Sequence, residues 1–218
     1  MSVDQRLDGI ESDDDGRKGG ETAPATDGRL LRSERTKQAI VDALLDLIKA
    51  GTLRPSSAQI AEKAGVTQRT LFNQFGDMET LFTAVTKRQT ERVAHLLPTV
   101  VPGTLQERAT HFADQLSELL EEIMNIRWAV LTTAEGVQRF GSSVELFGTV
   151  MRHQFNNAFD EELLTLSPQE RDEILDVLEI EADPLTWRMR RLQQRRSQEQ
   201  ARDLVERAII SILRGCRG

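Results

Sequence analysis

The sequence predicts an all-α protein, and three observations lead to this prediction. From about residue 29 onward, apolar side chains recur every three or four positions, which is helical spacing. No segment shows the sustained alternation of apolar and polar residues that a half-buried strand has. Capping residues and glycines separate one periodic segment from the next. We expect three closely spaced helices, a long connecting helix and a C-terminal helical bundle.

The first helix is expected from about Ser33 to Ala50, because its apolar pairs recur every four residues and form one buried stripe. Gly51 follows as its stop signal. Ser56 and Gln59 have the spacing of a capping box, so a second, short helix should begin there.

The third and fourth helices have caps of their own. Gly65 should end the second helix, after which Thr67 can cap the third and Asp77 the fourth. The fourth helix should run to about Leu97, where Pro98 and a second proline break the pattern. We expect a boundary between two modules at this point.

The C-terminal part is expected to continue as helices, over about residues 105–123 and 144–159. Pro168 follows Ser167 at the first position of another helix. The last helix, from about residue 197 to 213, is apolar over much of its circumference. Such a face predicts a dimer interface if it is exposed in one chain. The alternative is that it packs within its own chain.

Charge divides the sequence into three parts. Residues 1–28 hold 8 acidic and 3 basic residues, and we expect them to form a disordered tail. Residues 29–97 hold 7 acidic and 11 basic residues, whereas residues 98–218 hold 20 acidic and 14 basic residues. Because charges beyond roughly 8–10 Å are screened, the basic part can meet a polyanion despite the net charge of −7.

The remaining composition narrows the class of protein. No apolar run approaches the roughly 18 residues of a transmembrane helix, and the acidic N-terminus lacks the apolar stretch of a secretory signal. The single cysteine, Cys216, allows no disulfide within one chain. We therefore expect a cytoplasmic protein with no membrane partner.

The stretch from Ser56 to Asp77 has the spacing of a helix-turn-helix unit. Ala61 is small where the two helices approach, and Gly65 falls in the turn. Ile60, Val66 and Leu71 are apolar where the pair must pack on the first helix, which leaves a polar face outward.

That polar face carries side chains that can read DNA. Arg can bond guanine through two hydrogen bonds, Asn and Gln can do the same to adenine, and a Thr methyl can touch thymine. An ordinary solvated helix face is the alternative, but such faces are usually mixtures of Glu and Lys. We expect the DNA-binding residues to be Arg35, Ser56, Thr67, Gln68, Arg69, Thr70, Asn73 and Gln74.

A ligand pocket is a second expectation, for the C-terminal bundle. Apolar residues at helical spacing can line such a pocket, although they can equally be plain core. The candidates are Phe112, Leu116, Trp128, Leu131, Phe147, Met151, Phe155 and Trp187. No spacing typical of a metal site and no catalytic motif is visible, so we expect no cofactor, no metal and no enzymatic activity.

The segment IAEKAGVTQRTLFNQFGDMETLF strongly resembles the TetR family of bacterial transcriptional regulators, and the specific motif covers about residues 33–85. The matching positions are Ser56, Ile60, Ala61, Ala64, Gly65, Val66, Thr67, Thr70, Leu71, Phe72, Phe75, Glu79 and Leu81. Three residues depart from the family pattern. Phe72 stands where many members have Tyr, Gln74 replaces His or Tyr, and Met78 replaces Lys.

The resemblance implies an N-terminal helix-turn-helix DNA-binding domain and a C-terminal bundle for dimerisation and ligand binding. A homodimeric repressor would bind a pseudo-palindromic operator and be released by a small, apolar ligand. The departures imply weaker contacts to phosphate and a shallower salt dependence. The alternatives are an activator, a ligand-independent DNA binder, and a helical adaptor that has lost specific DNA binding.

Overall fold

The computed structural model describes residues 25–132 and 136–215, with side chains for residues 28–132 and 145–215. Most of the predicted acidic tail, and Cys216, lie outside the described residues. The all-α prediction is confirmed, since the described part of the chain holds ten α-helices and no strand. None of these helices combines the length and the apolar character that crossing a membrane requires.

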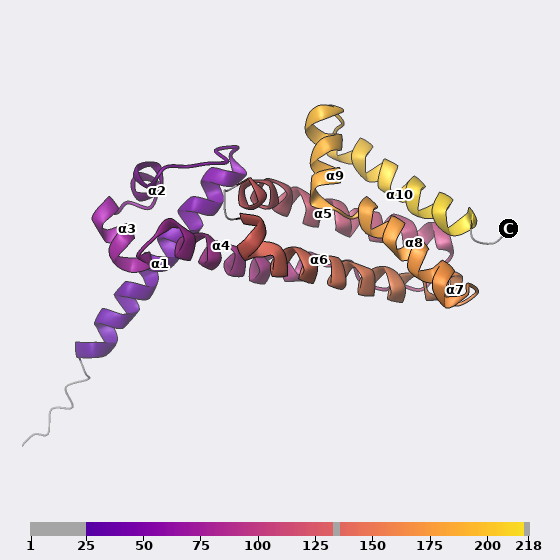
Figure 1. The fold of residues 1–218 in the computed structure, drawn as a ribbon, viewed down its shortest axis with the longest axis horizontal. Helices are drawn as coiled ribbons and strands as arrows, with labels where there is room; N and C mark the ends of the chain where they lie inside the picture. The colour runs from indigo at the N-terminus through magenta and orange to yellow at the C-terminus, as the bar shows by residue number, and fades with distance from the viewer. Residues whose placement is uncertain (1–24, 133–135, 216–218) are drawn as a thin grey trace, which may run out of the picture.

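Two short segments of other helical type accompany the α-helices, a 3₁₀-helix η1 and a π-helix η2. In chain order the elements are α1 (Ala25–Lys49), α2 (Ser57–Lys63), α3 (Gln68–Phe75), α4 (Met78–Val93), η1 (Ala94–Leu96), α5 (Leu105–Leu131), α6 (Gly136–Ala158), α7 (Asp160–Leu163), α8 (Pro168–Glu181), α9 (Pro184–Arg188), η2 (Met189–Gln193) and α10 (Gln198–Gly215). Helices α1 to α3 form one end of an elongated molecule, and α5 to α10 form the other (Figure 1).

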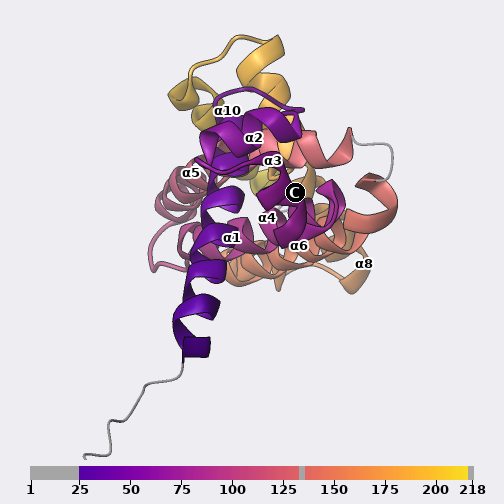
Figure 2. The ribbon, with the colours of Figure 1, turned by 90° about the vertical axis from the view of Figure 1, so that its left-hand side faces the viewer.

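Helix α1 begins at Ala25, about two turns before the predicted start. The sequence prediction followed a buried stripe, but Leu30 and Leu31 are exposed and the first turns bury little. Leu and Arg in these turns nevertheless have good helix propensity, and the turns extend a helix that the buried stripe already stabilises. They extend past α3 at the end of the molecule, as two perpendicular views show (Figures 1 and 2).

The predicted caps of the helix-turn-helix are confirmed. Ser56 and Gln59 form a capping box at the start of α2, and Thr67 and Asp77 cap α3 and α4. Gly65 lies in the turn with a φ of +66°, a conformation that costs a residue with a Cβ free energy. The three helices enclose an N-terminal core that includes Ile40, Leu44, Ile48, Ile60 and Leu71.

Helix α4 connects this core to the rest of the molecule. Leu81 and Val85 in its first half pack in the N-terminal core, whereas Val93 at its end packs in the C-terminal core. The α-helix stops at Val93, not near Leu97 as predicted, and tightens into η1. Pro98 explains why the helical segment ends after Leu96, because Leu97 precedes the proline and avoids the α-helical conformation.

Helix α5 is the central element of the C-terminal bundle and packs against α4, α6, α9 and α10. Phe112 of α5 stacks on Phe155 of α6, with ring centroids 4.5 Å apart, and Phe159 lies beside both. At its other end, α5 places Ile126, Ala129 and Val130 in the N-terminal core. Helices α4 and α5 thus both join the two cores.

Part of the apolar face of α10 is buried within its own chain. Ala201, Val205, Ile209 and Leu213 all lie in the C-terminal core, where α10 packs on α5. The sequence left open whether this face meets a second chain or its own. The structure shows the second arrangement for these four residues, whereas Leu204, Ala208 and Ile212 of the same predicted face are half-buried and leave the first arrangement open.

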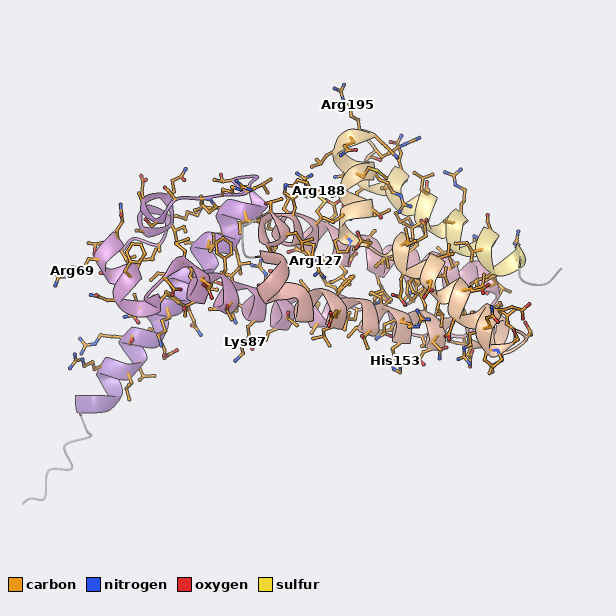
Figure 3. The ribbon with its side chains drawn as sticks, in the orientation of Figure 1. Arg69, Lys87, Arg127, His153, Arg188 and Arg195 are labelled. Atoms are coloured by element: carbon orange, nitrogen blue, oxygen red, sulfur yellow. The ribbon has the colours of Figure 1, made fainter. Side chains whose placement is uncertain are left out.

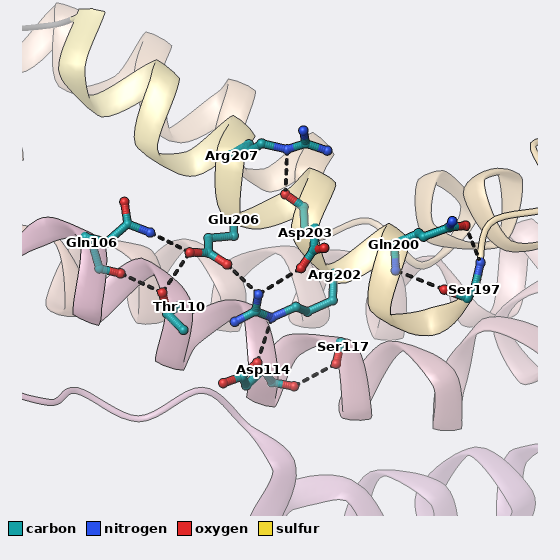
Figure 4. A network of polar contacts seen from close by, with 10 residues as sticks. All are labelled: Gln106, Thr110, Asp114, Ser117, Ser197, Gln200, Arg202, Asp203, Glu206 and Arg207. Atoms are coloured by element: carbon teal, nitrogen blue, oxygen red, sulfur yellow. Dashed lines mark hydrogen bonds and ion pairs between the residues drawn. The ribbon is translucent and has the colours of Figure 1, made fainter.

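A polar network holds α10 on α5 beside that apolar contact (Figure 4). The Arg202 guanidinium lies 2.7 Å from Asp114 and 2.9 Å from Asp203. Burial alone would lower the pKa of Arg202, but these carboxylates together with Glu206 raise it. Glu206 also accepts a hydrogen bond from Thr110 of α5 at 2.7 Å.

Candidate nucleic-acid interface and ligand cavity

Helix α3 presents a polar face at the end of the molecule. Leu71 and Phe75 are buried, which fixes the rotation of this short helix, and Arg69 and Asn73 are exposed on it. The Arg69 side chain projects away from the body of the protein (Figure 3). The side chains of Arg69 and Asn73 make no hydrogen bond or ion pair within the described residues, so their side-chain donors and acceptors are available to a partner.

Other predicted DNA-binding residues hold this unit together. The Thr67 hydroxyl accepts a hydrogen bond from the Thr70 backbone N–H at 3.1 Å and lies 2.9 Å from the Thr70 hydroxyl. The Ser56 hydroxyl accepts a hydrogen bond from the Gln59 backbone N–H at 3.3 Å, and the Ser56 backbone N–H donates to Gln59 Oε1 at 2.8 Å, which begins α2. These hydroxyls therefore serve as caps, whatever further contacts they make.

Two glutamines tie α3 to the neighbouring helices. Gln68 Oε1 accepts from the Ser57 hydroxyl of α2 at 3.4 Å, and Gln74 Oε1 accepts from the Ser33 hydroxyl of α1 at 3.0 Å. Each amide NH₂ remains a donor. Gln74 is half-buried, so it presents less of its side chain than Arg69 does.

Cations lie on the first turns of α1. Arg29, Arg32 and Arg35 are all exposed at intervals of three residues. Lys37 is less available, because its ammonium pairs with Glu34 at 3.2 Å. When such cations contact DNA phosphates, they fix the position of a protein on the duplex and add affinity, but they do not distinguish one base sequence from another.

The departures from the family pattern have visible consequences. Met78 is half-buried and packs against the N-terminal core, where Lys would carry a charge. Phe72 is 40% exposed on α3, so its ring lies at the surface without a hydroxyl.

A comparison with known families matches residues 37–85 to the family described as bacterial regulatory proteins, tetR family. The match covers the second half of α1, all of α2 and α3, and the first half of α4. These are the helices that present Arg69 and Asn73. The chain belongs to the TetR family. It is a TetR-family transcriptional regulator with a helix-turn-helix DNA-binding unit.

Solved structures share the fold of this TetR-family chain. A transcriptional regulator from Rhodococcus sp. RHA1 has a TM-score of 0.58 at 15% identity, over 84% of this chain and 96% of that one. A TetR-like transcriptional regulator from the same organism has a TM-score of 0.56 at 20% identity, over 83% and 96%. A protein from Pseudomonas aeruginosa PAO1 has a TM-score of 0.56 at 15% identity, over 92% and 97%. No curated protein matches the sequence.

The TetR-family chain also contains a cavity of about 180 Å³ between α4, α5 and α6. Its wall is mostly apolar, with four polar side chains. The lining residues are Thr86, Gln89, Thr90, Val93, Ala94, Leu97, Leu119, Ile123, Ile126, Arg127, Val130, Leu146, Phe147 and Val150.

Of the eight residues predicted to line a ligand pocket, Phe147 lines this cavity. Trp128 and Leu131 are half-buried, and the Arg188 guanidinium lies 4.5 Å from the Trp128 ring centroid. The other five are fully buried in the C-terminal core, namely Phe112, Leu116, Met151, Phe155 and Trp187.

The polar residues of the cavity wall were absent from the sequence prediction. Arg127 follows Ile126 within the apolar pattern of α5, three residues before Val130. A cation inside an apolar stripe was the signal that could have identified it. Its pKa is lowered by burial, with a smaller raising effect from the charge of Asp183.

Proposed function

We propose that the protein is a homodimeric repressor that binds a pseudo-palindromic operator and is released by a small ligand. The observation that carries this proposal is the pair of unused hydrogen-bonding side chains, Arg69 and Asn73, on an exposed and rigidly held α3. Residues 29–97 would form the DNA-binding part, and residues 98–218 the ligand-binding and dimerisation part. The regulator would work in the cytoplasm, without enzymatic activity.

Recognition of DNA would follow the geometry of other helix-turn-helix proteins. Helix α3 would enter the major groove, with Arg69 bonding guanine and Asn73 bonding adenine through two hydrogen bonds each. The cations on α1 would contact phosphates beside the groove. Ser56, Thr67, Gln68, Thr70 and Gln74 would support α3 and add contacts at its edges.

Dimerisation is supported by the exposed apolar side chains of α8. Val177 and Ile180 are 44% and 59% exposed, and residues three apart lie on the same face of a helix. Two chains that meet through this face would bury side chains that a single chain leaves in water. Two copies of α3 could then read the two halves of a symmetric site.

Helix α4 offers a route from the ligand cavity to the DNA-binding unit. Gln89 and Val93 line the cavity at its C-terminal half, while Leu81 and Val85 pack in the N-terminal core. A ligand that shifts this half of α4 relative to α5 would therefore move the N-terminal core. Such a ligand releases DNA only if it binds the released conformation more tightly than the DNA-bound one.

The alternative is a helical adaptor that has lost specific DNA binding. Met78 favours it, because this residue packs on the N-terminal core where the family pattern has a cation. An activator or a ligand-independent DNA binder would differ from a repressor in how ligand changes operator affinity.

The experiment that tests the proposal is selection of duplex DNA from a random library by the purified full-length protein. We expect enrichment of a sequence with two-fold symmetry, and none with the double variant Arg69→Ala/Asn73→Ala. If the wild-type protein enriches nothing even at low salt, the adaptor alternative is correct. If the protein enriches a site without two-fold symmetry, the proposal that it binds DNA as a homodimer is contradicted.

A further inference from the structure

Arginines that the fold buries are, as a rule, paired with carboxylates. Arg108 lies 2.6 Å from Glu162, Arg152 lies 2.8 Å from Asp176, and Arg202 lies 2.7 Å from Asp114. Arg190 and Arg191 are paired in the same way, with Glu181 and Glu121. This pattern is expected, because a charge removed from water costs free energy unless an opposite charge or hydrogen bonds replace the water.

Arg127 and Arg188 depart from this pattern, because neither side chain makes an ion pair or hydrogen bond within the described residues. Of the two, only Arg127, which is half-buried, lines the cavity. Its guanidinium lies 5.3 Å from the centroid of the Phe147 ring, which also lines the cavity. Asp183 acts on it only through its more distant charge.

The contact with Phe147 leaves the donors of Arg127 unused. A cation–π contact involves no hydrogen-bond acceptor, so the five N–H groups of the guanidinium have no acceptor within the described residues. These groups form a fork that matches the two oxygens of a carboxylate. Burial lowers the pKa of Arg127, but an arginine remains charged at neutral pH.

The other polar groups of the cavity wall already donate to the backbone. The Thr86 hydroxyl donates to the Phe82 carbonyl at 3.1 Å, and the Thr90 hydroxyl donates to the Thr86 carbonyl at 3.0 Å. The Gln89 side-chain amide donates to the Glu122 carbonyl at 3.2 Å. Arg127 therefore holds most of the unused donors, and the group that fits beside it is an anion.

The rest of the wall determines the body of the ligand. Val93, Leu119, Ile123, Ile126 and Val130 surround the cavity and offer no hydrogen bond from their side chains. A cavity of about 150 Å³ is large enough to hold benzene. A volume of about 180 Å³ thus fits a ring or short chain with one small head group.

We infer that the cavity binds a small organic carboxylate with an apolar body, of about the size of benzoate, whose head group pairs with Arg127. The regulatory consequence of binding rests on the proposed function, in which a ligand at α4 changes operator affinity. Binding itself is a property of the protein without DNA.

The test is isothermal titration calorimetry of the full-length protein without DNA. The probes are benzoate, phenylacetate and hexanoate, each compared with its neutral amide: benzamide, phenylacetamide and hexanamide. We expect at least one carboxylate to bind about tenfold or more tightly than its amide, because a hydrogen bond to a charged group contributes more than a neutral one.

Two arginine variants make a matched pair. Arg127→Gln should abolish the preference for the carboxylate over its amide, and Arg127→Lys should retain part of it. Arg188→Gln is the control, because Arg188 also lies over an aromatic ring but does not line the cavity. We expect Arg188→Gln to bind as the wild-type protein does. Thermal unfolding of each variant checks that it is folded.

A third variant tests the location independently of charge. Val150→Phe adds a ring at the cavity wall and should abolish carboxylate binding while Arg127 is intact. The inference is overturned if every amide binds as tightly as its carboxylate, if no carboxylate binds, or if Arg127→Gln keeps the preference. Operator affinity with and without ligand is measured separately, so a carboxylate that binds but leaves DNA affinity unchanged contradicts ligand release, not this site.

Discussion

Arg69 and Asn73 differ from their neighbours on α3 because the fold leaves their side-chain hydrogen-bonding groups without a partner among the described residues. The sequence predicted which α3 residues point outward, since the apolar spacing of Leu71 and Phe75 sets the rotation of the helix. It could not predict the bond from Ser33 to Gln74, because that bond depends on how α1 packs against α3.

Phe72 provides the first residue-scale prediction. Its ring is exposed on α3, so Phe72→Tyr adds a hydroxyl at the surface without changing the core. If that hydroxyl reaches a phosphate, operator affinity should rise about two- to tenfold, the effect of one hydrogen bond. The salt dependence should not change, because a neutral hydroxyl releases no counterion. Fluorescence anisotropy at several salt concentrations measures both quantities, and unchanged affinity would place Phe72 away from the phosphates.

The ion pair of Arg108 and Glu162 provides the second residue-scale prediction. Their side chains are 6% and 2% exposed, and both Glu162 oxygens accept from Arg108 at 2.6 Å. Arg108→Met removes the cation that pairs with the buried Glu162 carboxylate, and should lower the free energy of unfolding by about 3–5 kcal/mol. The double variant Arg108→Met/Glu162→Leu should recover most of this loss. Urea denaturation measures both, and equal stability of the single and double variants would contradict the account.

Among the elements, the caps of the helix-turn-helix were predictable because they depend on residues a few positions apart. The start of α1 was not, because its first turns are exposed and leave no apolar stripe in the sequence. The cavity was not predictable either. Apolar spacing shows that Phe112, Phe155 and Phe147 face the interior, but only the packing of three helices decides that Phe147 borders an empty space.

Thr67 provides the prediction at the scale of the element. Its hydroxyl caps α3, and α3 is too short to be stable without its neighbours and its cap. Thr67→Ala should lower the free energy of unfolding by about 1 kcal/mol, whereas Thr67→Ser keeps the cap and should leave it nearly unchanged. Operator affinity should follow the same order. If Ser and Ala at this position behave alike in thermal unfolding, the cap contributes nothing.

At the scale of the whole molecule, α4 and α5 connect two apolar cores. The sequence predicted two modules with a boundary near Pro98, on the basis of charge and proline positions. It could not show that Ile126, Ala129 and Val130 of α5 return to the N-terminal core, because that contact joins segments far apart in the sequence. Nor could the sequence show that α5 of the same chain packs on the apolar face of α10. Apolar periodicity indicates that a face is buried, but not whether its own chain or a second chain buries it.

The central claim is that α3 reads DNA bases rather than only touching the backbone. The measurement that tests it most directly is the ratio of affinities for the selected operator and for a scrambled duplex, in the wild-type protein and in Arg69→Ala. Loss of a base contact should cost about 1–3 kcal/mol on the operator and much less on the scrambled duplex, so the ratio should fall about tenfold or more. If both affinities fall by the same factor, or neither changes, Arg69 does not read sequence and the account is wrong.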